Sequence, residues 1–236
     1  MNKLKKDYQL LFRNVPTVVV VAFCIAVTFM NLMANKIIFQ PNDYVSADAG
    51  FLLSWIPFLC MDITTKRFGA KASIMLNTFA VVVNVICVLL AGFIAWLPSG
   101  NGEDFSAFNT VFGSCWFIVI ASITAMLLSG VANSLLNSFI GSKMKEDTAK
   151  SYYIRTWLST FFGQWLDNFV FAGIAFGIFA PIFWGWGYSL TLCVGAGVLG
   201  ALLELFCEMV FSPLGYKICR KWERDNVGAE WLELMS

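Results

Sequence analysis

Six apolar stretches restrict the fold of this chain more than any other feature of its sequence. In lipid every backbone N–H and C=O must be paired inside the protein, so a stretch that crosses the bilayer is expected to be a helix of about 20 residues. Hydrophobic residues make up 58% of the chain, far more than a soluble domain can bury. We therefore predict an all-α polytopic membrane protein with six transmembrane helices. The stretches cover about 15–36, 47–61, 72–97, 112–140, 156–181 and 186–215.

The second stretch is shorter than the other five. It contains Gly50 and Pro57 and lies between Asp48 and Asp62. Such a helix can be broken or partly re-entrant where protein or water covers its backbone. The boundaries predict three segments: a cytoplasmic N-terminal segment over 1–14, a six-helix membrane domain over 15–216 and a cytoplasmic C-terminal tail over 217–236.

Basic residues are distributed unevenly between the predicted loops. If the N-terminus is cytoplasmic, every one of the 16 Lys and Arg residues except Lys36 falls on the cytoplasmic side. The outer loops instead carry Asp43, Asp48, Glu103 and Asp104. Cytoplasmic loops of membrane proteins are enriched in Lys and Arg. The sequence thus predicts six crossings of a cell (inner) membrane with both termini in the cytoplasm.

Histidine is absent, which removes the commonest general base and the usual metal ligand. The seven cysteines show no C-x-x-C spacing and lie mostly in apolar runs, where a reduced cysteine behaves as a small hydrophobe. We expect no catalytic residue, no cofactor and no metal site, and we predict that the protein is not an enzyme.

Asp167 is the most informative polar residue. It lies in Trp157–Phe183, which contains no other charged residue. An Asp at the centre of a membrane helix costs about 3 kcal/mol. Arg155, Ser159 and Gly163 precede it at intervals of four residues, and such a ridge allows another helix to approach closely. Two interpretations remain open: a solute or ion site, or a single polar contact between packed helices.

A similar ridge follows the fourth apolar stretch. Its members are Ala121, Ala125, Ser129, Asn133 and Asn137, again four residues apart. If the fourth and fifth helices are antiparallel, their polar positions could face each other across a pseudo-symmetric centre, as in transporters built from repeats. The alternative is a chance similarity between two apolar helices that both contain Ser and Asn residues.

Further acidic residues fall in and beside the spans. Glu204 and Glu208 are four residues apart, so their carboxylates would repel each other unless one holds a proton or both share a cation. Together with Arg155, they are candidates for the residues that couple transport to an ion. The alternative is that Glu208 snorkels, or pairs with Arg220 or Lys217. Local physics suggests only structural roles for Asp62, which can pair with Lys66 one helical turn on, and for Gly69 as a helix stop.

Several segments together resemble the vitamin-uptake-like transporters that include the bacterial queuosine precursor transporters. The resemblance covers nearly the whole chain in order. The chain departs from the family pattern at Lys66 and Asn133, where family members commonly carry acidic residues, and at Phe68, where they carry Tyr. The resembling segments are Ala34-Asn35-Lys36, Pro57 to Asp62 and on to Phe68-Gly69, Arg155-x-x-x-Ser159-x-x-x-Gly163-Gln164-x-x-Asp167, and Pro213-x-x-Tyr216.

The resemblance implies import of 7-deazaguanines for making queuosine in tRNA, namely 7-cyano-7-deazaguanine, its 7-aminomethyl form or queuine. The ring N–H and exocyclic NH₂ of such a base are adjacent donors that the carboxylate of Asp167 could accept. Amide side chains could bind the other edges, and aromatic residues could stack on the ring. The implied substrate-binding residues are Asp167, Gln164, Asn168, Asn133, Asn35 and Asp62.

Alternative functions stay open at this point. One is the substrate-binding subunit of an ATP-driven vitamin uptake system, with the small residues of Ala22-x-x-x-Ala26 docking a partner helix. Another is an intramembrane enzyme that uses paired carboxylates, and a third is a purely structural membrane subunit. The expected partners are a small-molecule substrate and the lipid bilayer, without nucleic acid, and a homodimer is an arrangement that the sequence allows.

Overall fold

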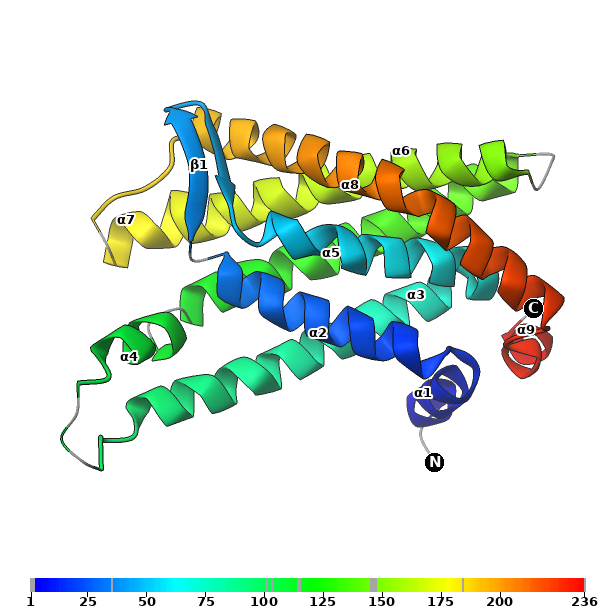
Figure 1. The fold of residues 1–236 in the computed structure, drawn as a ribbon, viewed down its shortest axis with the longest axis horizontal. Helices are drawn as coiled ribbons and strands as arrows, with labels where there is room; N and C mark the ends of the chain where they lie inside the picture. The colour runs from blue at the N-terminus through cyan, green and yellow to red at the C-terminus, as the bar shows by residue number, and fades with distance from the viewer. Residues whose placement is uncertain are drawn as a thin grey trace.

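The computed structural model describes residues 3–34, 36–100, 102, 104–113, 116–144, 148–183 and 185–235, and most of them are helical. The predicted helical fold is confirmed (Figure 1). The elements are α1 (Lys3–Asn14), α2 (Thr17–Met33), β1 (Ile37–Asn42), β2 (Val45–Asp48), α3 (Phe51–Trp96), α4 (Ser106–Gly113), α5 (Trp116–Lys143), α6 (Ala149–Ala172), the π-helix η1 (Gly173–Phe179), α7 (Ala180–Phe183), α8 (Leu190–Arg224) and α9 (Ala229–Met235).

The long helix α3 is interrupted at Gly69. The backbone there has φ 84° and ψ 166°, a conformation that glycine adopts without the steric penalty of a Cβ. Figure 1 shows the chain reversing at this point, so that the second part of α3 runs back along the bundle. The expectation of a helix stop at Gly69 is confirmed. The second apolar stretch is longer than expected, because its helix is continuous through Pro57 from Phe51 to the break.

Four described helical segments are long and apolar enough to cross a membrane: α3, α5 from Val119 onwards, the run of α6, η1 and α7 to Ile182, and α8. The pair α1 and α2 adds a fifth if it is counted as one span bent by 108°. The bend lies at Pro16, which lacks a backbone N–H and disfavours helical geometry in the residue before it. The protein is thus a multi-pass membrane protein.

Both ends of the chain lie at the same end of the bundle, called here the termini end (Figure 1). The end of α5, the start of α6 and the break in α3 lie there too, whereas α4 and the strands lie at the opposite end. The helix α9 packs on α1, where the backbone N–H of Trp231 donates to Asn14 at 3.3 Å. The predicted boundary at 216/217 falls inside α8, which continues to Arg224.

A β-hairpin that the sequence analysis did not predict connects α2 to α3. Strands β1 and β2 pair antiparallel, with Ile37 opposite Asp48. The turn forms because the Asn42 side chain accepts from the backbone N–H groups of Tyr44 and Val45 at 2.9 and 3.1 Å. The hairpin lies against α8, where a Cβ on Gly195 would collide with the carbonyl oxygen of Tyr44. The predicted second stretch, 47–61, therefore begins in β2.

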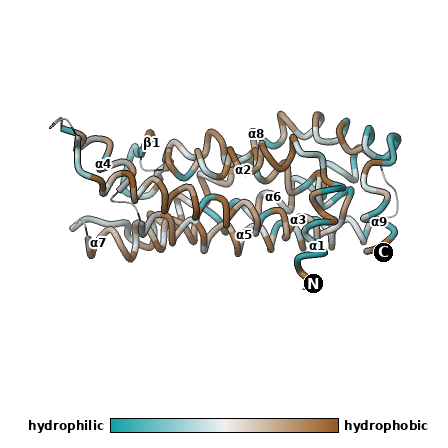
Figure 2. Tube along the Cα trace, turned by 90° about the horizontal axis from the view of Figure 1, so that it is seen from below, coloured by the Kyte–Doolittle hydropathy of each residue, from teal (hydrophilic) through white to brown (hydrophobic). Residues whose placement is uncertain are grey.

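Apolar side chains lie both inside the bundle and on its outer surface. Phe23 and Val27 of α2 are fully buried, while Val18, Ile25 and Phe29 on its other face are about half exposed or more. Exposed apolar bands of this extent fit contact with lipid. Figure 2 shows hydrophobic residues along the length of the bundle and hydrophilic residues gathered at the termini end.

Candidate functional site

The helices α5 and α6 meet along a polar seam. Ser129 Oγ donates to Asp167 Oδ1 at 2.6 Å, and Asn137 Nδ2 donates to Ser159 Oγ at 3.2 Å. Asn133 faces Gly163, and at the termini end Gly141 faces Arg155. Each step of four residues along α5 thus meets a step of four in the opposite direction along α6. The prediction that the two ridges face each other is confirmed.

Asp62 is the centre of a buried cluster at this seam. Its Oδ1 accepts from Asn133 Nδ2 at 3.0 Å and from Asn137 Nδ2 at 2.8 Å, and its Oδ2 accepts from Thr160 Oγ1 at 3.0 Å. Arg155 Nε donates at 2.8 Å to the other side of Asn137. We call Asp62, Asn133, Asn137, Thr160 and Arg155 the Asp62 cluster.

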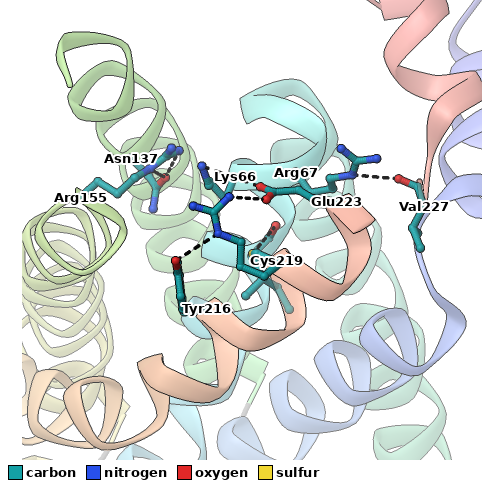
Figure 3. Close-up of polar contacts among 10 residues, drawn as sticks. Lys66, Arg67, Asn137, Arg155, Tyr216, Cys219, Glu223 and Val227 are labelled. Atoms are coloured by element: carbon teal, nitrogen blue, oxygen red, sulfur yellow. Dashed lines mark hydrogen bonds and ion pairs between the residues drawn. The ribbon is translucent and has the colours of Figure 1, made fainter. Parts of the chain in front are cut away.

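The expected pairing of Asp62 with Lys66 is wrong. Asp62 points into the bundle and is completely buried, whereas Lys66 lies 4.0 Å from Glu223 of α8. Figure 3 shows Glu223 beside Lys66, with Arg155 reaching Asn137 nearby, and Glu223 also accepts from Arg220 Nη1 at 2.7 Å. Lys66 of α3 and Glu223 of α8 thus join these two helices at the termini end, and the buried carboxylate is held by α5 and α6 instead.

A separate cavity of about 40 Å³ lies between the hairpin and the helices. Two carboxyl groups of spanning helices face it, Asp167 from α6 and Glu204 from α8, and Phe51 and Phe171 add aromatic surface. Glu204 accepts from Ser54 Oγ and from Asn168 Nδ2, the latter at 2.9 Å. The complete lining is Met30, Asn31, Ala34, Asp48, Gly50, Phe51, Ser54, Ser122, Asp167, Asn168, Phe171 and Glu204, which we call the outer cavity.

The hairpin covers the outer cavity. A second pocket of about 20 Å³ between β2 and α8 shares Asp48, Phe51, Asn168 and Phe171 with it. The hairpin is fixed by a buried hydrogen bond of 2.6 Å between Ser46 Oγ and Tyr188 OH. Any solute larger than a few water molecules therefore requires the cavity to widen, and the hairpin is the non-helical part of its wall.

Asp48 makes the hairpin sensitive to pH. It lies in β2, outside the spanning helices, and burial raises its pKa from 3.8 to about 6. A carboxyl whose pKa is raised on folding contributes stability at low pH that is lost as the pH rises through the folded-state value. The shift corresponds to at most about 3 kcal/mol.

We expect the melting temperature of the wild type to fall, relative to that of Asp48→Asn, as the pH rises from about 4 to about 7. The asparagine is a suitable reference because its amide oxygen still accepts from the N–H of Gly50 but does not titrate. Differential scanning fluorimetry of both purified proteins measures this. Parallel pH profiles would contradict a buried, titrating Asp48.

The predicted site residues divide between these two places. Asp167 and Asn168 line the outer cavity, together with the coupling candidate Glu204. Gln164 is buried beside it, with Nε2 3.5 Å from the carbonyl oxygen of Ser54. Asp62, Asn133 and Arg155 belong to the Asp62 cluster instead, and Asn35 lies outside the described residues.

Glu208 is completely buried, and it neither snorkels nor pairs with Arg220, which binds Glu223 at 2.7 Å. That alternative is wrong. Glu204 interacts electrostatically with Asp167, and Glu208 with Asp62. The two glutamates therefore belong to different sites one helical turn apart.

Sequence reasoning missed several lining residues. Asp48 and Ser54 reach the outer cavity only because the hairpin and the start of α3 fold over it, and no local pattern predicts that contact. In the Asp62 cluster, the sequence analysis did not name Asn137 and Thr160 as site residues. A signal existed for Asn137, which lies on the ridge of residues four apart in the fourth apolar stretch. Among the described residues, no group of three or more Cys, Asp or Glu side chains is placed to hold a metal ion.

Comparison with known protein families supports a role in transport. The model of the family described as "Putative vitamin uptake transporter" matches residues 48–218. The chain belongs to this family. The match begins in β2 and ends in α8, so it includes the Asp62 cluster and the outer cavity except for Met30, Asn31 and Ala34 of its lining. No match was found among curated proteins or among solved structures. Membership of the vitamin uptake transporter family supports transport of a small, vitamin-like solute across the membrane.

Proposed function

We propose that the protein imports a 7-deazaguanine, namely 7-cyano-7-deazaguanine, its aminomethyl form or queuine, for making queuosine in tRNA. The observation that carries this proposal is the pair of carboxyl groups, Asp167 and Glu204, on one cavity with the amide of Asn168. A guanine-type base presents adjacent N–H and NH₂ donors, which a carboxylate accepts in pairs. The family supports a transported solute, and the chemistry of the cavity supports its class.

Each edge of such a base has a counterpart in the outer cavity. Among the described residues, Ser129 alone donates to Asp167, and it does so to Oδ1, so Oδ2 is available to the ligand. Asn31 Nδ2 has no described acceptor and can donate to the ring carbonyl. Phe51 and Phe171 can stack on the ring faces. The protonated aminomethyl form would gain from the two acidic side chains.

A planar heterocycle requires a larger cavity than the one between the helices, because ligand pockets usually enclose roughly 300 Å³ or more. We infer that binding displaces the hairpin and breaks the contact between Ser46 and Tyr188. The structure thus corresponds to the closed state of the carrier, and opening of the hairpin would expose the outer cavity.

Six crossings of the cell (inner) membrane are part of this proposal. Six helical segments supply these crossings: α2, the two parts of α3 on either side of Gly69, α5, the run from α6 to α7, and α8. The termini end carries Lys66, Arg67 and the basic residues of α1 and α8, so by the positive-inside rule it faces the cytoplasm. The hairpin and the outer cavity then face the outside, as an importer requires.

Reporter fusions test the orientation. We expect a tag after Ser236 and a tag in the loop over 143–150 to be cytoplasmic, and a tag near Gly102 to be outside. Alkaline phosphatase and fluorescent protein fusions report the two sides. Finding the tags near Gly102 and in 143–150 on the same side would contradict six crossings.

A ligand panel tests the substrate class. We expect 7-cyano-7-deazaguanine and its aminomethyl form to raise the melting temperature of the purified protein more than guanine, thiamine, riboflavin or biotin do, since a ligand of the native state stabilises it. A larger shift with one of the vitamins would replace the proposed substrate. Co-purification with an ATPase module would make the protein a subunit of an ATP-driven system, and turnover of a bound ligand would make it an enzyme.

A further inference from the structure

Two buried carboxyl groups outside the outer cavity have opposite surroundings. Asp62 has hydrogen-bond donors at both oxygens, with Asn133, Asn137 and Thr160 at 2.8–3.0 Å. Donors at this distance stabilise a negatively charged carboxylate inside a protein. The Arg155 guanidinium, bound to the far side of Asn137, adds a positive charge to the same cluster. Burial itself opposes ionisation, but of the two carboxyl groups Asp62 is the one whose donors and nearby positive charge can hold a negative charge.

Glu208 has none of these partners. It is completely buried in α8, and no described residue donates a hydrogen bond to Oε1 or Oε2. An ionised carboxylate without donors is among the most costly groups to bury, and its electrostatic interaction with Asp62 adds repulsion. Glu208 is thus in surroundings that suit its protonated form.

The charges around Glu208 then balance. With a proton on Glu208, the negative charge of Asp62 is matched by the positive charge of Arg155. Loss of that proton leaves one uncompensated negative charge in the bundle. Among the residues that the structure describes, the other titratable groups that interact with Glu208 are neutral in their ordinary forms: Cys60 of α3, Tyr152 of α6 and Cys207 of α8.

We propose that Glu208, opposite Asp62, carries the proton whose movement down its gradient drives uptake. The O–H bond of the Glu208 carboxyl breaks, the proton leaves to the cytoplasm, and a proton from the outside restores the acid in the next cycle. Glu204 in the outer cavity lies one helical turn away on α8, so ligand and proton sites share one rigid helix. This inference rests on the proposed import function.

A polar face of α8 leads from Glu208 towards the termini end. Ser212 follows after one turn and is completely buried, and Tyr216 and Arg220 follow at the next two turns. Tyr216 OH accepts from Arg220 Nε at 3.1 Å (Figure 3). Ser212 Oγ donates to the carbonyl oxygen of Met209 at 3.2 Å, so this hydroxyl has to rotate before it and Tyr216 can pass the proton to the side that we assign to the cytoplasm.

Proteoliposomes with labelled 7-cyano-7-deazaguanine test the proposal. With the membrane potential clamped at zero, one proton per substrate allows the wild type to accumulate ligand up to about tenfold per unit of imposed pH gradient, and a protonophore abolishes the accumulation. We expect Glu208→Gln to exchange ligand across the membrane without accumulating it. Glu230→Gln, which removes an exposed carboxylate of α9, should accumulate ligand like the wild type.

Infrared spectroscopy gives a readout that needs no substrate. The wild type at neutral pH should show the carbonyl band of a protonated carboxylic acid, shifted by H/D exchange, and the difference spectrum of wild type minus Glu208→Gln should keep a band of this kind, since subtraction removes the contribution of other buried carboxyl groups such as Glu204. A wild type without this band overturns the proposal even if the variant does not fold. Accumulation by Glu208→Gln equal to that of the wild type overturns it as well. If the band is present but no 7-deazaguanine binds, the proposed import function fails and the proton site stands.

Discussion

Replacing Asp167 with Asn is expected to lower the affinity for 7-cyano-7-deazaguanine by roughly 30- to 150-fold, because a charge-assisted hydrogen bond in a dry site contributes about 2–3 kcal/mol. Asn keeps the side-chain volume and an acceptor for Ser129 Oγ, which donates to Oδ1. The helix should therefore insert and pack as before. The new NH₂ group, however, opposes the ring donors of the ligand. Equilibrium binding to purified protein measures the loss.

Asp43→Asn is the matched control, since it removes the same charge from the exposed hairpin turn, away from the cavity lining. In cells that depend on external precursor, Asp167→Asn should fail to support queuosine formation in tRNA, while Asp43→Asn supports it. Import by Asp167→Asn at the wild-type rate would make Asp167 a packing residue. Failure of that variant to fold would make its carboxylate mainly structural.

Replacing Gly163 with Leu is expected to destabilise the bundle by about 2–3 kcal/mol, because the seam has no room for a side chain at that position. A Cβ there would lie 2.7 Å from Phe58 Cε1 and 2.9 Å from Asn133 Cβ. The melting temperature should fall by roughly 5–10 °C. Gly173→Leu is the control, since no atom lies within 4 Å of a Cβ at Gly173. Since leucine favours a helix more than glycine does, helix propensity predicts no loss in either variant, and equal losses in the two would mean that the seam does not explain the effect.

The helices were predictable because hydrophobicity acts locally along the chain. Each of the six apolar stretches is mainly helical, and the four-residue ridges predicted the contact between α5 and α6, since both ridges carry their own periodicity. Gly69 was predictable as a stop because its conformation favours glycine. These features depend on a few neighbouring residues each.

The contents of the candidate site were less predictable because they depend on contacts between distant segments. Asp62 lies among donors from α5 and α6, 71 to 98 residues further along the chain, and its neighbour Lys66 gave the wrong partner. Most of the hairpin lies between the first stretch and the second, where the sequence analysis expected only an outer loop, so Asp48 was assigned to that loop. Glu204 and Glu208 looked like a pair because the sequence does not show which neighbours face each turn of α8.

The seam between α5 and α6 also restricts how its residues can change together. At each step a large side chain on one helix meets a small one on the other, and the large member changes sides, as Asn133 against Gly163 and Arg155 against Gly141 illustrate. The space at each step is thus filled mainly by one side chain, which comes from α5 at some steps and from α6 at others. A residue of the seam can change size only if its counterpart compensates, so these positions should covary among relatives even where neither residue touches the transported solute.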